Sequence, residues 1–158
     1  MGHHLQAVVG KARAVAQLAR NWVHARLVLL PQGFALIPNT SALRAEMFEQ
    51  FAEKEAPFPH EELSLLSAAL AIRDASAGAR LGYIETDYFG GMGDQSAIGW
   101  ESGAVACRSP QPGPPINTVL AWMGAIADTG SDEFDALHLG NSRDTDSVAE
   151  RFGKPVRG

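Results

Sequence analysis

The stretch between Leu81 and Trp100 constrains the fold of this chain more than any other. Two segments rich in β-forming residues, 81–89 and 95–100, flank the glycine-rich connection Gly90-Gly91-Met92-Gly93-Asp94. Strand-like runs joined by a short glycine-containing connection are typical of a hairpin, whose strands run antiparallel. A tight turn at 101–103 then leads into a further strand over 104–107. The sequence therefore predicts a three-stranded antiparallel meander in this part of the chain.

The segments around this meander alternate between strand and helix patterns. Apolar and β-branched runs predict three earlier strands, over 4–9, 24–30 and 34–37. Apolar residues at helical spacing predict helices over 12–22, 41–51, 63–77 and 116–127, with short helical turns after residue 128. Together these elements predict an α+β fold, a mainly antiparallel sheet of about five to six strands packed against three to four helices.

The size and composition of the chain favour a single domain. Its 158 residues are 46% hydrophobic and 20% charged, which is enough apolar material for one core. The proline-rich loop over 109–115 is the only candidate boundary, and each side of it looks too small to fold alone. We expect one domain over 1–152, followed by a polar, proline-containing tail over 153–158 that frays.

The charge pattern limits the classes of partner. The net charge is −5, and the 13 lysines and arginines are scattered, whereas binding to nucleic acid depends on clustered basic residues. We therefore expect no nucleic-acid partner, while another protein of basic charge is allowed. Ordinary solubility also accounts for a net charge of this size. The oligomeric state is left open.

The expected location is the cytoplasm. The first residues lack the basic and then apolar run of a secretory signal, and no apolar stretch approaches the roughly 20 residues of a membrane span. Cys107 is the single cysteine, which excludes an internal disulfide and a cysteine-rich metal cluster. We interpret Cys107 as a buried, inert thiol. No membrane partner is predicted.

The block from Tyr83 to Gln95 contains the candidate binding residues. Strand alternation places Tyr83, Glu85 and Asp87 on one face of the sheet. The Cα atoms of the two carboxylate residues are then roughly 6.5 to 7 Å apart, from the strand rise of about 3.3 Å per residue. That spacing suits two ligands of one cation, or an acid and a base. A solvated sheet face with no ligand is the other interpretation.

The glycines beside this strand have two interpretations as well. Glycine permits positive φ and close approach of the main chain, so the loop amides could surround an anion. Against this, the order of residues is not that of a P-loop or dinucleotide motif, and Asp94 would repel an anion. A hairpin connection with special dihedral angles is the alternative. The candidate binding residues are Tyr83, Glu85, Asp87, Gly90, Gly91, Gly93, Asp94 and Gln95.

No catalytic residue can be assigned, and neither a metal nor a cofactor is predicted. The five histidines fall in unrelated segments, so no nucleophilic triad is indicated. His3 and His4 are adjacent and would point to opposite faces of a strand, which prevents a shared metal. The acidic segment 128–135 lacks the residue order of a calcium loop. We interpret it as helix capping and negative surface.

The run from Tyr88 to Trp100, with Pro115-Ile116-Asn117 and Asp132-Glu133-Phe134-Asp135, resembles a group of small uncharacterised bacterial proteins. The resemblance extends over most of the chain. It implies a bacterial, cytoplasmic setting and a role akin to that of immunity proteins, small acidic proteins that neutralise toxins. It implies no catalytic residue.

Three functional hypotheses follow. The leading one is a non-catalytic protein-binding domain, with the immunity-like role that the resemblance implies, whose contact surface is formed by the 87–96 hairpin and the acidic 128–135 segment. The second is an enzyme or small-ligand-binding protein with its site at the 83–95 strand and glycine-rich loop, where Glu85 and Asp87 act as acid, base or cation ligands. The third is a structural subunit of a homodimer, which an exposed apolar patch with Trp100 or Trp122 would favour.

Overall fold

The computed structural model describes residues 2–51, 72, 79–89, 92–102, 104–108 and 115–156, and its centre is one sheet of seven antiparallel strands. Their order across the sheet is β6-β5-β4-β1-β3-β2-β7. The strands are β1 (Gln6–Lys11), β2 (Arg26–Leu29), β3 (Phe34–Pro38), β4 (Arg80–Phe89), β5 (Met92–Glu101), β6 (Ala104–Arg108) and β7 (Lys154–Pro155). The predicted α+β class with a mainly antiparallel sheet is confirmed.

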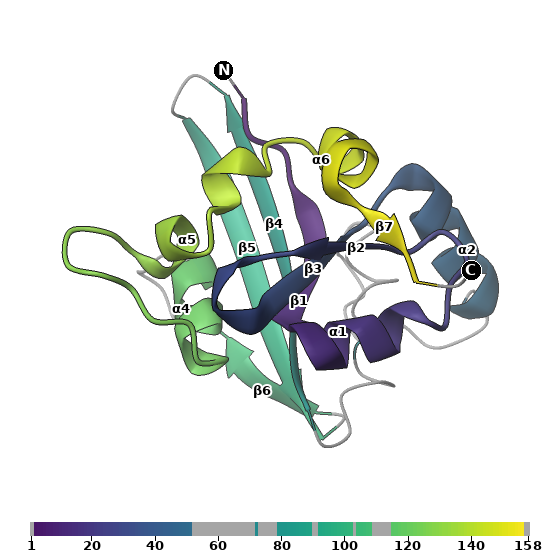
Figure 1. The fold of residues 1–158 in the computed structure, drawn as a ribbon, viewed down its shortest axis with the longest axis horizontal. Coiled ribbons are helices and arrows are strands. Elements are labelled where there is room, and N and C mark those ends of the chain that lie inside the picture. Colours follow the sequence, from purple (N-terminus) through teal and green to yellow (C-terminus); the bar gives the residue numbers. More distant parts are fainter. Residues whose placement is uncertain are drawn as a thin grey trace.

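Helices cover both faces of this sheet (Figure 1). On one face lie α1 (Ala12–Ala19) and α2 (Ser41–Phe51), and on the other α4 (Pro115–Trp122), α5 (Glu133–Ala136) and α6 (Thr145–Phe152). Two 3-10 turns, η1 (Pro31–Gly33) and η2 (Leu139–Asn141), complete the described elements. The helix predicted over 63–77 lies outside the described residues, apart from Ile72.

Each face of the sheet has its own apolar core, because successive residues of a strand point to opposite sides. In β1, Val8 belongs to the core beneath α1 and α2, which also contains Leu18 and Met47. Its neighbours Ala7 and Val9 belong to the core beneath α4 and α6. The molecule thus has three layers, with the central strands buried on both faces.

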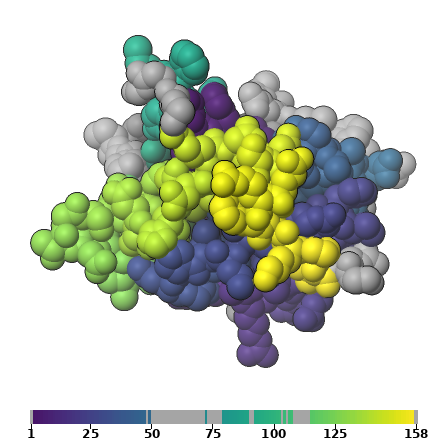
Figure 2. All heavy atoms as spheres, turned by 45° about the horizontal axis from the view of Figure 1, so that its top comes forward, coloured from purple at the N-terminus to yellow at the C-terminus, as the bar shows by residue number. Residues whose placement is uncertain are grey.

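The hairpin of β4 and β5 extends beyond this layered body. The ladder between β4 and β1 ends at the pair of Glu85 with Gln6, and the ladder between β5 and β6 ends at Ile98. Above these points the β1–β4 ladder gives way to the isolated bridge of His3 with Tyr88 and to single contacts, such as the Thr86 amide donating to the carbonyl of Leu5 at 2.8 Å. We call residues 81–84 and 97–100 the lower hairpin, and residues 85–89 and 92–96 the upper hairpin. In Figures 1 and 2 the end of the upper hairpin projects beside the N-terminus.

Two differences from the predicted elements concern weak local signals. The second hairpin strand was predicted from residue 95 but starts at Met92, because Gly93 and Asp94 are paired with Tyr88 and Asp87 despite their low β-propensity. The seventh strand, β7, lies in the tail and pairs with Arg26 and Leu27 of β2.

Among the described residues, no helix combines the length and the apolar character needed to cross a bilayer.

Candidate functional site

An acidic pocket of about 450 Å³ lies at the upper hairpin, on the face of the sheet that carries α2. Strands β1, β4 and β5 form its floor, and α2 and the beginning of α6 supply further walls. We call it the acidic pocket. Its lining residues are His4, Gln6, Arg44, Glu85, Thr86, Asp87, Asp94, Gln95, Ser96, Asp144, Thr145 and Asp146.

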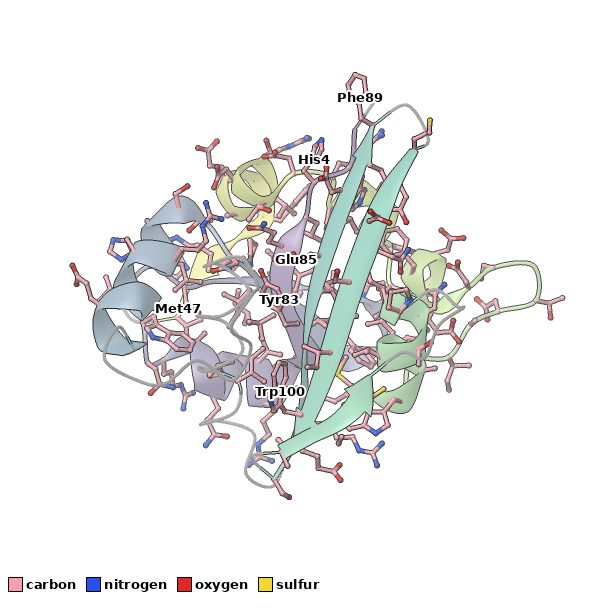
Figure 3. The ribbon with its side chains drawn as sticks, turned by 180° about the vertical axis from the view of Figure 1, so that it is seen from behind. His4, Met47, Tyr83, Glu85, Phe89 and Trp100 are labelled. Carbon is pink, nitrogen blue, oxygen red and sulfur yellow. The ribbon has the colours of Figure 1, made fainter. Side chains whose placement is uncertain are left out.

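The structure brings four of the predicted binding residues into this pocket: Glu85, Asp87, Asp94 and Gln95. Tyr83 lies fully buried beneath it, and the Tyr83 hydroxyl donates a hydrogen bond of 2.8 Å to Oε1 of Glu85. Figure 3 shows Tyr83 and Glu85 next to each other along β4. Burying the phenol in the core while its hydroxyl reaches the carboxylate fixes the orientation of Glu85.

Gly93 is needed for the shape of the hairpin. Its φ is +154°, and a Cβ at this position would collide with the main-chain carbonyl of Asp87. The interpretation of this glycine as part of a hairpin with special dihedral angles is therefore the one that the geometry supports. The predicted sites at Gly90 and Gly91 lie outside the described residues.

His4 connects the hairpin to α6. Its Nδ1 lies 2.9 Å from Oδ1 of Asp87. Its main chain is fixed from the other side, because the His4 amide donates to the carbonyl of Arg143 at 2.6 Å and the Thr145 amide donates to the carbonyl of His4 at 3.1 Å. His4 lines the acidic pocket while the adjacent His3 lines a different pocket, so the two imidazoles face different sites, as strand alternation predicts.

Asp144 is the N-cap residue of α6. The amide of Ser147 donates to its Oδ1 at 2.9 Å, and this hydrogen bond holds the pKa of the Asp144 carboxyl below its ordinary value. The nearby imidazole of His4 acts in the same direction. Asp144 is therefore anionic at neutral pH, and its charge faces the pocket.

The balance of charge in the pocket is strongly negative. Among the described residues, five carboxylates line it, and Arg44 supplies the one guanidinium. Arg44 is committed to the wall, because it donates to Oε1 of Gln6 at 2.9 Å and to the carbonyl of Asn39 at 2.8 Å. Asp87 and Asp94 are directly opposite partners in the β4–β5 ladder, and like charges at such positions destabilise a sheet. The arrangement favours the arrival of a cation.

Sequence reasoning missed His4, Arg44, Asp144, Thr145 and Asp146 as pocket residues. They come from the two ends of the chain and from α2, and no local pattern relates these segments to the hairpin. The one usable signal was Asp144, an N-cap residue directly before the helical pattern of α6. That signal predicts a helix start, but it does not predict which surface the helix start faces.

A second pocket of about 280 Å³ lies on the other face of the upper hairpin. It reaches the acidic 128–135 segment through Asp132, which caps α5 by accepting a hydrogen bond of 2.9 Å from the amide of Asp135. The capping interpretation of this segment is thus confirmed at Asp132. Among the described residues, no group of three or more histidine, cysteine, aspartate or glutamate side chains is arranged to hold a metal ion.

The remaining predicted residues have structural surroundings. Trp100 is buried in the core, and Trp122 is partly buried with the Arg80 guanidinium over its ring, 4.9 Å from the centroid. Cys107 is partly buried, and this burial raises the pKa of its thiol. Two exposed apolar residues, Phe89 and Met92, form the last pair of the β4–β5 ladder at the end of the hairpin.

Comparison with known proteins adds no relative: no family model, no curated protein and no solved structure matches this chain.

Proposed function

We propose that this protein is a non-catalytic binding domain that receives a basic side chain of a partner protein in the acidic pocket. The observation that carries the proposal is the pocket itself, a 450 Å³ cavity in which five carboxylates surround a space at an exposed end of the sheet. Opposite charges attract at short range, and complementary charge speeds and orients protein association.

The groups that would meet the partner are accessible. The side chain of Asp87 is 83% exposed and that of its partner His4 is 52% exposed. A cation placed between Asp87 and Asp94 would relieve the repulsion of these directly opposite carboxylates. Asp87 already contacts His4 through Oδ1, so the partner's cation would add contacts to Asp94 and to the second oxygen of Asp87.

The end of the hairpin supplies the apolar part of such an interface. Phe89 and Met92 are directly opposite each other in the ladder, and the two residues are 76% and 80% exposed. Aromatic and methionine side chains are enriched in protein interfaces, where they act as anchors. We propose that they contact the partner next to the basic side chain, in a bacterial cytoplasmic setting and with a role like that of immunity proteins.

The proposal is tested by titrating isotope-labelled protein with short capped peptides rich in arginine or lysine, followed by NMR. We expect saturable shifts at Asp87, Asp94 and Asp144. The Asp87→Asn/Asp94→Asn variant replaces both opposed carboxylates and is expected to weaken peptide binding about tenfold. This factor corresponds to a loss of about 1.4 kcal/mol in the free energy of binding.

The matched control is the Asp128→Asn/Asp135→Asn variant, which removes the same charge from the acidic 128–135 segment. It separates the pocket from the effect of net charge. Equal losses of peptide affinity in the two double variants would mean that binding depends on net charge and not on the acidic pocket. A larger loss of affinity in the control would mean that the peptide binds at the acidic 128–135 segment.

A small organic polycation is the second candidate occupant. The cavity volume falls in the range of about 300 to 1,000 Å³ that is usual for small-ligand sites, and Glu85 and Asp87 of β4 form part of its floor. Spermidine is a suitable probe. A Phe89→Ala/Met92→Ala variant distinguishes the candidates, because a protein partner needs the apolar hairpin end whereas spermidine in the pocket does not.

A further inference from the structure

The second pocket of the upper hairpin has a different chemistry from the acidic pocket. It is lined by His3, Thr86, Tyr88, Gln95, Asn117, Asp132 and Phe134. Three of these residues carry aromatic rings and one carries a carboxylate. We call it the aromatic pocket. It lies on the side of the sheet that carries α4 and α5, because Tyr88 alternates with Asp87 along β4.

Hydrogen bonds hold one wall of the aromatic pocket in place. The amide of Ile116, at the start of α4, donates to Oε1 of Gln95 at 3.0 Å. Nε2 of Gln95 in turn donates to the hydroxyl oxygen of Tyr88 at 3.1 Å. The phenol ring is thus positioned by the helix start, and a ligand would meet a wall that is already organised.

The opposite wall is fixed in the same way. Nδ2 of Asn117 donates to Oδ2 of Asp132 at 3.0 Å, and Oδ1 of Asn117 accepts from the amide of Phe134 at 2.9 Å. One asparagine therefore holds both the carboxylate of Asp132 and the main chain of Phe134 in place. The Asp132 carboxylate keeps further lone pairs for a ligand, because a carboxylate accepts up to about four hydrogen bonds.

His3 contributes its ring to the pocket and uses its nitrogens elsewhere. Its Nε2 lies 3.0 Å from the carbonyl of Leu139, so this nitrogen carries a proton, and its Nδ1 lies 2.6 Å from the hydroxyl of Thr86. The imidazole ring is tilted against Phe134 with 5.5 Å between the centroids. The two ring nitrogens of His3 therefore make hydrogen bonds within the protein, while the ring itself lines the pocket.

We propose that the aromatic pocket binds a small organic cation whose charge is surrounded by apolar groups, such as a methylated ammonium. The carboxylate of Asp132 repels anions, and it supplies the charge that an ammonium needs. The faces of aromatic rings attract cations, most strongly when water is displaced, and methyl groups fill the apolar remainder of the space. The acidic pocket, lined by five carboxylates among the described residues, instead suits the basic side chain proposed above, which carries several N–H donors.

The ligands that test this proposal are tetramethylammonium and ammonium, both as chloride salts, titrated into isotope-labelled protein and followed by NMR. We expect tetramethylammonium to shift the side-chain amide of Asn117 and the main-chain amide of Phe134 in a saturable way, because neither residue lines the acidic pocket. Ammonium is expected to bind there at least fivefold more weakly, because it has no methyl groups to contact the rings.

Two variants assign the contributions of charge and ring. Asp132→Asn keeps an oxygen for capping α5 and removes the charge, and it is expected to weaken tetramethylammonium binding about fivefold. Phe134→Leu keeps an apolar side chain without the ring, and a similar loss is expected. The control is Asp135→Asn, the same change of charge within the short helix that Asp132 caps, at a residue outside the pocket lining, with an expected effect below twofold.

Some results would overturn the proposal. These are equal affinity for the two cations, shifts confined to residues of the acidic pocket, or equal losses in Asp132→Asn and Asp135→Asn. A urea midpoint measured for each variant shows whether it is folded. If Phe134→Leu is unfolded, the proposal is tested with Asp132→Asn alone. Asp87 and Asp94 line the acidic pocket and not the aromatic pocket, so the Asp87→Asn/Asp94→Asn variant is expected to bind tetramethylammonium normally.

Discussion

The lower and the upper hairpin are two halves of the same pair of strands, yet they have opposite surroundings. In the lower half, Tyr83 is fully buried and Trp100 is 1% exposed. In the upper half, Phe89 and Met92 are among the most exposed apolar residues of the described chain. The ladder is continuous through both halves. Neighbouring strands and helices, not the strands themselves, therefore decide which half is core and which half is available for binding.

The largest expected effect contrasts two aromatic residues of this hairpin. Trp100→Ala is expected to lower the free energy of unfolding by about 3 to 5 kcal/mol, because it leaves a cavity in the core. Phe89→Ala, at the exposed end, is expected to change it by less than about 0.5 kcal/mol. Urea denaturation followed by circular dichroism measures both. A comparable loss for Phe89→Ala would mean that the upper hairpin is also packed in solution.

A smaller effect concerns the cap that connects the acidic pocket to α6. Asp144→Ala is expected to cost about 1 kcal/mol at pH 7, because the amide of Ser147 loses its acceptor. The folded-state pKa of Asp144 is lowered, so its contribution is complete above the unfolded value of about 3.9 and is lost as the pH falls through the folded value. The difference between the wild type and the variant is therefore expected to narrow below about pH 4.

Asp144→Asn is the control for this prediction, because asparagine also caps helices but does not titrate. It is expected to keep most of the stability at pH 7. Urea midpoints measured across the acidic range give the comparison. A constant difference between Asp144→Ala and the wild type down to pH 2 would contradict the assignment of the lowered pKa to the cap.

The smallest expected effect has the opposite sign. Asp94→Asn removes one of the two directly opposite carboxylates and is expected to stabilise the protein by about 0.3 kcal/mol at low salt. The gain should vanish in 1 M NaCl, where the screening length is about 3 Å. Asp128→Asn, at an exposed loop residue, is the control. If Asp94→Asn instead lowers the free energy of unfolding at low salt, the Asp94 carboxylate stabilises the fold, and the expected repulsion from Asp87 is absent.

Much of the fold was predictable because it is encoded by local patterns. Period-two alternation placed Tyr83, Glu85 and Asp87 on one face, and the glycine-containing connection predicted the antiparallel hairpin. The start of β5 was missed by three residues, since Gly93 and Asp94 favour turns when considered alone. Their pairing with β4 overrides that local preference.

The candidate site was predictable only in part. Four of its carboxylate and amide residues were identified, because they belong to one hairpin. The others, including His4, Arg44 and Asp144, come from segments far away in the chain. Their positions follow from the packing of β1 beside β4 and of α6 at the end of β1. Contacts between distant segments leave no periodic signal in a single sequence.

The amino-acid sequence by itself determined the class of fold, the antiparallel pairing within the meander and the face that each hairpin side chain takes. These properties depend on neighbouring residues and on the fixed alternation of a strand. Only the tertiary structure decided that helices cover both faces, that the upper hairpin stays exposed, and that two pockets of different chemistry lie on its two sides. Burial and pocket chemistry depend on which distant segments meet, and that is a property of the packed chain.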